Sequence, residues 1–238
     1  MKPTTAPRTG DWPEYLASMA ATSAQPALQR FYAADWPAAD TPLAEVEFVA
    51  LDIETTGLNA KRHSILSIGA IPFTLQRIRS NQAWQQLVRP QGDLMPESVV
   101  FHRITHSDIQ QAPRFAEIID DLVDQLAGKV AVVHYRNIER NFIDQAVHQA
   151  CAERLLFPMI DTMQIEANQY PQRQPGWLRR LLGRKPISIR LADSRSRYGL
   201  PLYQAHHALT DALGTAELFQ AQVATHFSPQ QRLGDFWC

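Results

Sequence analysis

Cysteine is scarce in this sequence, because only Cys151 and Cys238 occur among its 238 residues. Two cysteines so far apart form neither a disulfide framework nor the closely spaced pairs of a zinc site, so we expect a reducing, cytoplasmic location. Long apolar runs are also missing, and residues 1–20 contain no apolar segment of the kind found in signal peptides. We therefore expect neither secretion nor a membrane-spanning helix.

An excess of charge of either sign is missing as well. The formal net charge is -1, with 20% charged and 45% hydrophobic residues, which is the balance of an ordinary soluble protein. This composition excludes an overall basic field, so any binding of a polyanion requires a local basic cluster or bound metal ions. The sequence also contains no P-loop, GxGxxG, HExxH or GxSxG motif.

Short apolar runs predict a mixed α/β sheet. Three runs joined by short loops are typical of an antiparallel meander, at residues 48–52, 64–75 and 84–90. Later segments have helical spacing and alternate with two further apolar runs at 129–135 and 157–162; the helical ones are 115–129, 137–156 and 206–227. We expect three antiparallel strands followed by parallel strands, with helices on both faces.

The composition divides the chain into three parts. Residues 1–45 are rich in Ala and Pro, carry two short helical patterns, and are interpreted as an N-terminal helical appendage. Residues 46–227 form the expected main domain, and 228–238 form a C-terminal tail. A basic insertion at about 171–192 interrupts the main domain. It could be a phosphate-binding flap in which Trp177 stacks on a base, a solvated insertion, or a docking site for a partner.

Two carboxylates follow the first predicted strand, within the stretch LDIETTGL (51–58). Asp52 and Glu54 are two positions apart, so their side chains point to the same side of a strand. Hard divalent cations prefer such oxygen ligands. A solvated strand end would carry the same pair, and further carboxylates elsewhere in the chain decide between the two interpretations.

The last predicted helix begins within the stretch HHALTDA (206–212). Asp211 lies in its first turns and off the apolar stripe, while His206 precedes the helix and is therefore on a loop from which it can reach a site. An acid that interacts favourably with the helix dipole, beside a surface histidine, explains the same residues without a function. His207 is interpreted as a bystander.

The helix predicted to begin near residue 137 carries an unusual carboxylate. On a helical wheel, Glu139 falls in the apolar half, whereas Asp144 falls in the polar half and is expected to point to water. Burial of a carboxylate is costly without a partner, so Glu139 is a candidate functional residue. The alternative is a first-turn Glu that bends back to solvent and is stabilised by the helix dipole.

Three stretches, DIETTGL, VVHYRNIERNFI (132–143) and HHALTDA, resemble in this order the three motifs of the DnaQ-like DEDDh 3′–5′ exonucleases, a family that includes the proofreading epsilon subunits of bacterial replicative polymerases. Weaker likeness occurs at FHRITHSDI (101–109), MIDTM (159–163) and RYGLP (197–201). The resemblance covers about residues 46–225. It implies a ribonuclease H-like fold and hydrolysis of nucleic acid from the 3′ end to nucleoside 5′-monophosphates.

The resemblance also implies a set of catalytic residues. Two Mg²⁺ or Mn²⁺ ions would be held by four carboxylates, those of Asp52, Glu54, Glu139 and Asp211. His206 would act as the general base toward the attacking water. The family usually has Asp at the position of Glu139, so this chain departs from the pattern by one methylene group in the second motif.

Further residues are implied as contacts of the substrate. The resemblance places Thr55, Thr56, Gly57 and Leu58 against the terminal nucleotide, with Leu58 against a base, and adds His134 to this group. Tyr135 stands where the family usually has Asn. The implied substrate is the 3′ end of single-stranded DNA or RNA, and the implied partner is a polymerase or repair complex. The sequence does not decide between DNA and RNA, and it does not indicate an oligomeric state.

Two other functions remain open at the level of the sequence. The chain could be a nucleic-acid-binding module that kept the fold and lost turnover, with Glu139 as the cause. It could also be an accessory subunit that acts mainly through residues 1–45 or through the basic insertion. The presence of all five catalytic-type residues argues against the first of these, whereas the second is compatible with exonuclease activity.

Overall fold

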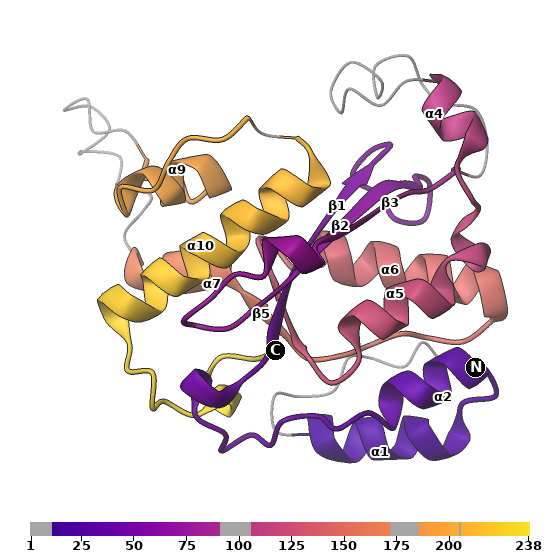
Figure 1. Ribbon diagram of the computed structural model, residues 1–238, viewed down its shortest axis with the longest axis horizontal. Helices are drawn as coiled ribbons and strands as arrows, with labels where there is room; N and C mark the ends of the chain where they lie inside the picture. Colours follow the sequence, from indigo (N-terminus) through magenta and orange to yellow (C-terminus); the bar gives the residue numbers. More distant parts are fainter. Residues whose placement is uncertain (1–10, 91–105, 172–185, 205) are drawn as a thin grey trace.

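The computed structural model describes residues 11–90, 106–171, 186–204 and 206–238 (Figure 1). Most of the basic insertion and most of the stretch at 101–109 therefore lie outside the described residues. The centre of the molecule is a five-stranded sheet in the order β3-β2-β1-β4-β5. The strands are β1 (Phe48–Thr55), β2 (Ile65–Phe73), β3 (Trp84–Leu87), β4 (Val130–Val133) and β5 (Met159–Asp161).

The direction of the strands confirms the predicted topology. The first three strands are paired in antiparallel fashion, β4 runs parallel to β1, and β5 runs parallel to β4. All nine residues of β2 and all four of β4 are buried, because helices and loops cover both faces of the sheet. The expectation of an α/β mixed sheet with helices on both faces is thus confirmed.

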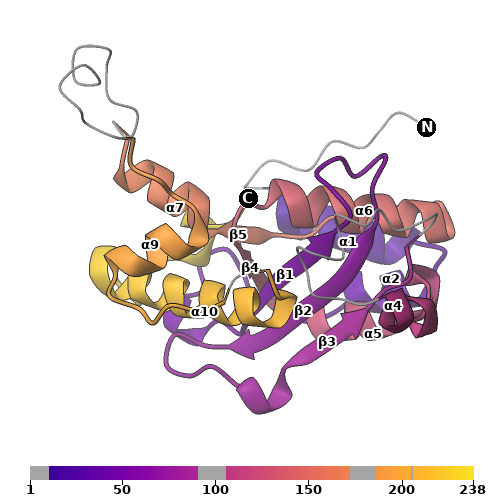
Figure 2. The ribbon, with the colours of Figure 1, turned by 90° about the horizontal axis from the view of Figure 1, so that it is seen from above.

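The helices form two layers, one on each face of the sheet (Figure 2). One layer contains α1 (Trp12–Thr22), α2 (Pro26–Tyr32), α5 (Ile119–Leu126) and α6 (Asn137–Cys151). The other contains α7 (Thr162–Gln169), α9 (Leu191–Arg197) and α10 (Ala208–His226). A further short helix, α4 (His106–Gln111), lies near the edge formed by β3. No helix among the described ranges is long and apolar enough to cross a membrane.

Helix α6 ends five residues earlier than the pattern predicts. Ala152 follows it in a left-handed conformation with φ 60°, which stops the helix and turns the chain. The backbone N–H of Leu155 then donates a hydrogen bond back to the carboxylate of Asp144, at 3.2 Å. A contact from outside the helix therefore fixes the turn, and helical spacing alone does not reveal it.

The described N-terminal and C-terminal segments share the cores of the main domain. Trp12, Leu28 and Phe31 of the first two helices are almost completely inaccessible to solvent. At the other end, the backbone of Cys238 exchanges hydrogen bonds with that of Met159, which extends the outer edge of β5. The division into an appendage, a main domain and a tail stays a proposal, and these contacts indicate that the three parts stabilise one another.

The two layers place the starts of three helices at one edge of the sheet. Strands β1, β4 and β5 run in the same direction, so their carboxyl ends lie at the same edge, and α6 and α7 begin there. Helix α10 begins against β2 at Gly69, the position that pairs with Asp52 on β1. A Cβ atom at Gly69 would lie 2.5 Å from the backbone of Ala208, so only glycine permits this close approach.

Candidate active site

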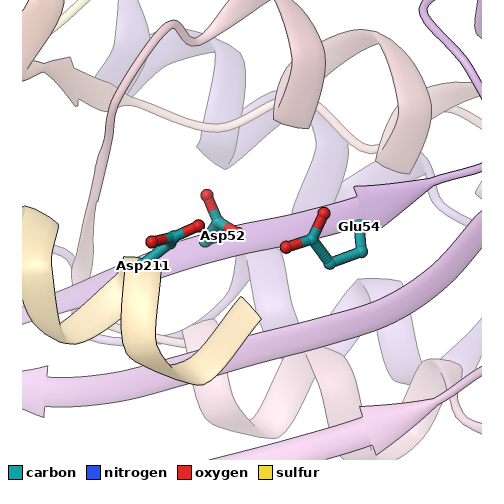
Figure 3. Close-up of side chains that lie close together, drawn as sticks. All are labelled: Asp52, Glu54 and Asp211. Atoms are coloured by element: carbon teal, nitrogen blue, oxygen red, sulfur yellow. The ribbon is translucent and has the colours of Figure 1, made fainter. Parts of the chain in front are cut away.

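Three carboxylates meet near the carboxyl end of β1 (Figure 3). Asp52 and Glu54 occupy alternate positions of the strand and project from the same side, and Asp211 comes from the first turn of α10. Each offers an oxygen atom that lies within 4.8 Å of the oxygens of the other two. Glu54 is buried, and the other two are partly buried. The structure therefore brings together three of the four predicted ligands.

The electrostatics of this group are unfavourable without a cation. Burial raises the pKa of Asp52 well above its usual range, and the charges of Glu139, Glu54 and Asp211 raise it further. Burial also raises the pKa of Asp211, although the hydrogen bond from the backbone N–H of His206 acts in the opposite direction. Oxygen donors gathered in this way suit a hard divalent cation, which would favour their charged forms.

Glu139 lies in the first turn of α6 and is only 2% exposed, as its place in the apolar half predicted. Burial raises its pKa well above the usual range, and the charges of Asp161 and Glu54 add to this effect. Its Oε2 atom has no hydrogen-bond partner among the described groups. Glu139 does not belong to the three-carboxylate group, but a buried oxygen without a partner is costly and indicates that a cation or a ligand completes it.

Asp144 was expected to point to water, and this prediction is wrong. The residue is only 7% exposed. Its carboxylate forms an ion pair with the guanidinium of Arg154, with Nε 2.6 Å from Oδ1, and accepts the hydrogen bond from Leu155 described above. The chain that follows α6 folds back over Asp144, whereas Asn141 and His148 of the same polar half stay exposed. Asp144 therefore holds the turn after α6 and does not face the carboxylate group.

His206 lies on the loop before α10, as predicted, and its side chain is exposed. Its backbone has a positive φ of 70°, and its N–H donates a 2.9 Å hydrogen bond to Oδ2 of Asp211. Such a conformation is costly for a residue other than glycine and often occurs at functional sites. His207 directly precedes α10, and its ring nitrogens lie 3.4 Å from the side chains of Gln85 and Thr210.

The loop after β1 is braced by its own hydrogen bonds. The hydroxyl of Thr55 donates to the carbonyl of Gly57 at 2.8 Å, and the backbone N–H of Thr56 donates to the carbonyl of Ser64 at 2.9 Å. Leu58 follows on this loop and is 84% exposed. A single exposed leucine is common on protein surfaces, so a contact of Leu58 with substrate stays a prediction.

His134 follows β4 and contacts protein groups through both ring nitrogens. Its Nδ1 lies 2.8 Å from the hydroxyl of Thr162, and its Nε2 lies 3.0 Å from the carbonyl of Ile189. Burial lowers the pKa of His134 to about 4, so the ring is neutral at pH 7. The contacts connect β4, α7 and the segment before α9. A role of His134 in substrate binding stays a prediction.

Asp161 was missed as a site residue by sequence reasoning. Its carboxylate accepts hydrogen bonds from the backbone N–H groups of Tyr135 and Arg136, at 3.0 and 3.2 Å, and it also caps the start of α7. Tyr135 has a positive φ of 86°. Asp161 thereby fixes the turn that leads to Glu139. An Asp between a strand and a helical pattern is a helix-capping signal, which could have identified the residue but not its second set of partners.

Comparisons with known proteins agree with this geometry. Residues 49–219 match the family of exonucleases named RNase_T. The chain is 30% identical over 181 residues to the DNA polymerase III subunit epsilon of Treponema pallidum. The matched region covers 76% of this chain and 78% of that protein. It is 25% identical to the 3′–5′ exonuclease DinG of Staphylococcus haemolyticus over 74% of this chain, but it spans only 18% of that longer protein.

Solved structures share the fold at low sequence identity. Exonuclease X in complex with DNA superposes with a TM-score of 0.59 at 19% identity, covering 78% of this chain and 97% of that one. The nuclease domain of 3′hExo, a DEDDh family member, superposes with a TM-score of 0.61 at 14% identity, covering 78% of this chain and 94% of that one. These likenesses confirm the ribonuclease H-like fold.

Fold and carboxylate group together define a metal-dependent 3′–5′ exonuclease. The match over residues 49–219 and the identity with the epsilon subunit show that the chain belongs to the exonuclease family.

Proposed function

We propose that this protein hydrolyses single-stranded DNA or RNA from a free 3′-hydroxyl end and releases nucleoside 5′-monophosphates, with Mg²⁺ or Mn²⁺ as the metal. The observation that carries the proposal is the group of Asp52, Glu54 and Asp211, whose oxygens lie within 4.8 Å of one another at the edge of the sheet. Glu139 adds a buried oxygen without a partner among the described residues.

Four carboxylates would hold two metal ions in this proposal, those of Asp52, Glu54, Glu139 and Asp211. When bound, two such ions stabilise the attacking and the leaving oxygen of an in-line displacement at phosphorus. The raised pKa values of Asp52 and Glu139 support this assignment, because a bound cation removes the cost of placing these charges together.

His206 would act as the general base. The water oxygen would form a new bond to phosphorus while its proton passes to the imidazole. The bond between phosphorus and the 3′ oxygen of the shortened strand would break, and this oxygen would keep the electron pair and take up a proton from solvent. A neutral imidazole is a competent base near pH 7. The hydrogen bond from the backbone of His206 to Asp211 supports this role, because it ties His206 to one of the proposed ligands.

The loop of Thr55, Thr56, Gly57 and Leu58 would bind the terminal nucleotide, with Leu58 against a base. The exposure of Leu58 on a hydrogen-bonded loop supports this role. The choice between DNA and RNA depends on contacts to the 2′-hydroxyl. A polymerase or repair complex is the proposed partner, since the Treponema pallidum relative is a DNA polymerase III subunit. We propose a cytoplasmic location because cysteine is scarce.

One assay tests the proposal. Purified protein is incubated with a labelled single strand and Mg²⁺, Mn²⁺ or a chelator, and the products are separated by length. We expect release of mononucleotides that requires a metal and a free 3′-hydroxyl, with a 3′-phosphate or a circular strand resistant. Cleavage of the circle would indicate an endonuclease. Binding of the strand without any release would favour a module that has lost turnover.

A further inference from the structure

Two adjoining cavities lie along α6, outside the carboxylate group. One has a volume of about 720 Å³ and begins at Leu58 and Asn137, and the other has a volume of about 520 Å³ and extends to Ala150. Both are lined by Ala60, Phe142 and Gln145, so they form one continuous groove. The groove follows α6 from its first turn to its end, over about 20 Å at 1.5 Å per residue.

Small side chains explain why the surface is hollow here. Helix α6 presents Ala146 and Ala150 to the groove, and the facing loops present Ala60 and Ala116. Phe142 forms part of the floor and is almost fully buried. Polar side chains such as Asn141 and Gln145 share the lining with these small apolar ones. An open groove with a lining of this mixed kind is suited to an extended ligand that has both flat apolar and charged parts.

Charge along the groove is positive, although the chain as a whole is not basic. Lys61, Arg89 and Arg114 line it with exposed side chains, and in the described part of the chain none of the three forms an ion pair. Asp144 contributes the one carboxylate among the lining residues, and Arg154 neutralises it. A formal net charge of -1 for the whole protein means that this positive character is local.

The groove also opens directly beside the proposed active site. Leu58 lies at its beginning and follows the loop after Glu54, and Asn137 lies in the same helical turn as Glu139. A strand whose 3′ end enters the carboxylate group past Leu58 can therefore continue along α6. Positive charge beside a mixed polar and apolar lining matches a single strand, because phosphates bind cations and bases pack on apolar surfaces.

We propose that this groove along α6 binds the part of a single-stranded nucleic acid that lies upstream of its 3′-terminal nucleotide. Lys61, Arg89 and Arg114 contact its phosphates, and its bases lie over the floor around Phe142. The inference rests on the proposed exonuclease function and extends it, since it assigns to this enzyme a preference for strands longer than a dinucleotide.

Binding without turnover gives the first test. The affinity of a labelled single strand is measured by fluorescence anisotropy in the presence of a chelator, at several salt concentrations. For each of Lys61→Ala, Arg89→Ala and Arg114→Ala we expect about two- to fivefold weaker binding at low salt. The slope of log K against log salt should fall by about 0.7 for each phosphate contact that is lost.

Arg77→Ala is the matched control, because it removes the same charge from an exposed arginine. Arg77 lies after Phe73, the last residue of β2. That end of the sheet is opposite to the end that carries Asp52. We expect this variant to bind like the wild type and to keep its salt slope. Equal losses in Arg77→Ala and in the groove variants would show a general effect of charge and would overturn the proposal.

Kinetics on strands of different length give the second test. For strands of about four to sixteen nucleotides, the triple variant of Lys61, Arg89 and Arg114 should raise KM about 10- to 100-fold with kcat nearly unchanged, because binding common to the ground state and the transition state is lost. The hydrolysis of a dinucleotide should be unaffected. A loss of the same size on the dinucleotide would place these residues in the active site instead, and unchanged KM on long strands would refute the groove.

The two tests separate this inference from the proposed function. If the protein hydrolyses no substrate but the groove variants lose affinity and salt slope, the exonuclease proposal fails and the groove stands. If hydrolysis is normal and the groove variants behave like Arg77→Ala in both tests, the exonuclease proposal stands and the groove fails.

Discussion

Gly69→Ala is the substitution that tests most directly how the fold assembles the carboxylate group. Gly69 pairs with Asp52 on the neighbouring strand, and the start of α10 lies directly on it. An added Cβ would stand 2.5 Å from the carbonyl carbon of Ala208 and 2.6 Å from the nitrogen of Leu209. Ordinary contact begins at 3.4 Å, so the backbone of α10 must move away by roughly 1 Å.

This movement carries one proposed ligand away from the others. Asp211 follows Ala208 by three residues on the same helix, whereas Asp52 and Glu54 remain on β1. A misplacement of about 1 Å can cost about 10²-fold in rate, because the reacting groups no longer meet in the productive geometry. Overpacking of this kind costs about 1–3 kcal/mol of stability, which is less than the 5–15 kcal/mol of a typical domain. We therefore expect Gly69→Ala to be folded and impaired.

The assay combines kcat on a single strand, Mn²⁺ affinity by calorimetry and thermal unfolding. We expect a loss of about 10²-fold in kcat and weaker Mn²⁺ binding. Gly214→Ala in α10 is the control, because its Cβ would make only ordinary contact with the side chain of Arg195, at 3.4 Å, and alanine favours a helix by about 1 kcal/mol. Near-native activity and Mn²⁺ affinity in Gly69→Ala would refute the reasoning that this contact positions Asp211.

Further substitutions at five positions give sharp expectations. Asp52→Ala should nearly abolish release of mononucleotides, while thermal unfolding of the metal-free protein stays unchanged or shifts upward because like charges are removed from a buried site. Glu139→Gln should reduce activity steeply at limiting metal, and Glu139→Asp should retain more activity than Glu139→Gln, as measured by Mn²⁺ titration of the rate. His206→Ala should lower kcat about 10²–10⁴-fold with Mn²⁺ affinity kept, whereas His207→Ala should behave like the wild type; the reverse outcome would exchange their roles. The pKa of His134 is lowered in the folded protein, so the unfolded chain takes up a proton before the folded protein does as the pH falls. The contribution of this residue to stability is therefore complete above pH 6.5 and is lost as the pH falls toward about 4. His134→Asn should flatten this part of the dependence of unfolding temperature on pH.

Sequence reasoning predicted the parts of the fold that depend on local periodicity. The antiparallel meander and the parallel strand at Val130–Val133 follow from short apolar runs, and both are present in the structure. The burial of Glu139 also follows from its position in the apolar half of its helix, because that half of a helix normally faces the core. Local patterns were sufficient to predict the environment of a residue wherever its own helix or strand determines that environment.

Local patterns failed where the surroundings come from a distant part of the chain. Asp144 lies on the polar half of α6, but Arg154 and the turn after the helix cover this residue. Gly69 carries no signal in the sequence, since its role depends on the helix that begins at Ala208. Asp161 gave a capping signal, but its contact with Tyr135 across two strands could not be read from spacing. These residues position the site without belonging to any motif.

The carboxylate group also links stability to metal binding. Burial and neighbouring charges raise the pKa values of Asp52, Glu139 and Asp211, so the folded metal-free protein holds protons that the unfolded chain has already lost. Their effect on stability is therefore absent below the ordinary carboxylate range and becomes unfavourable as the pH rises. A cation reverses this effect, because it binds the folded state and favours the charged carboxylates. The same arrangement that opposes folding of the metal-free protein at neutral pH therefore favours tight binding of the ions that the reaction requires.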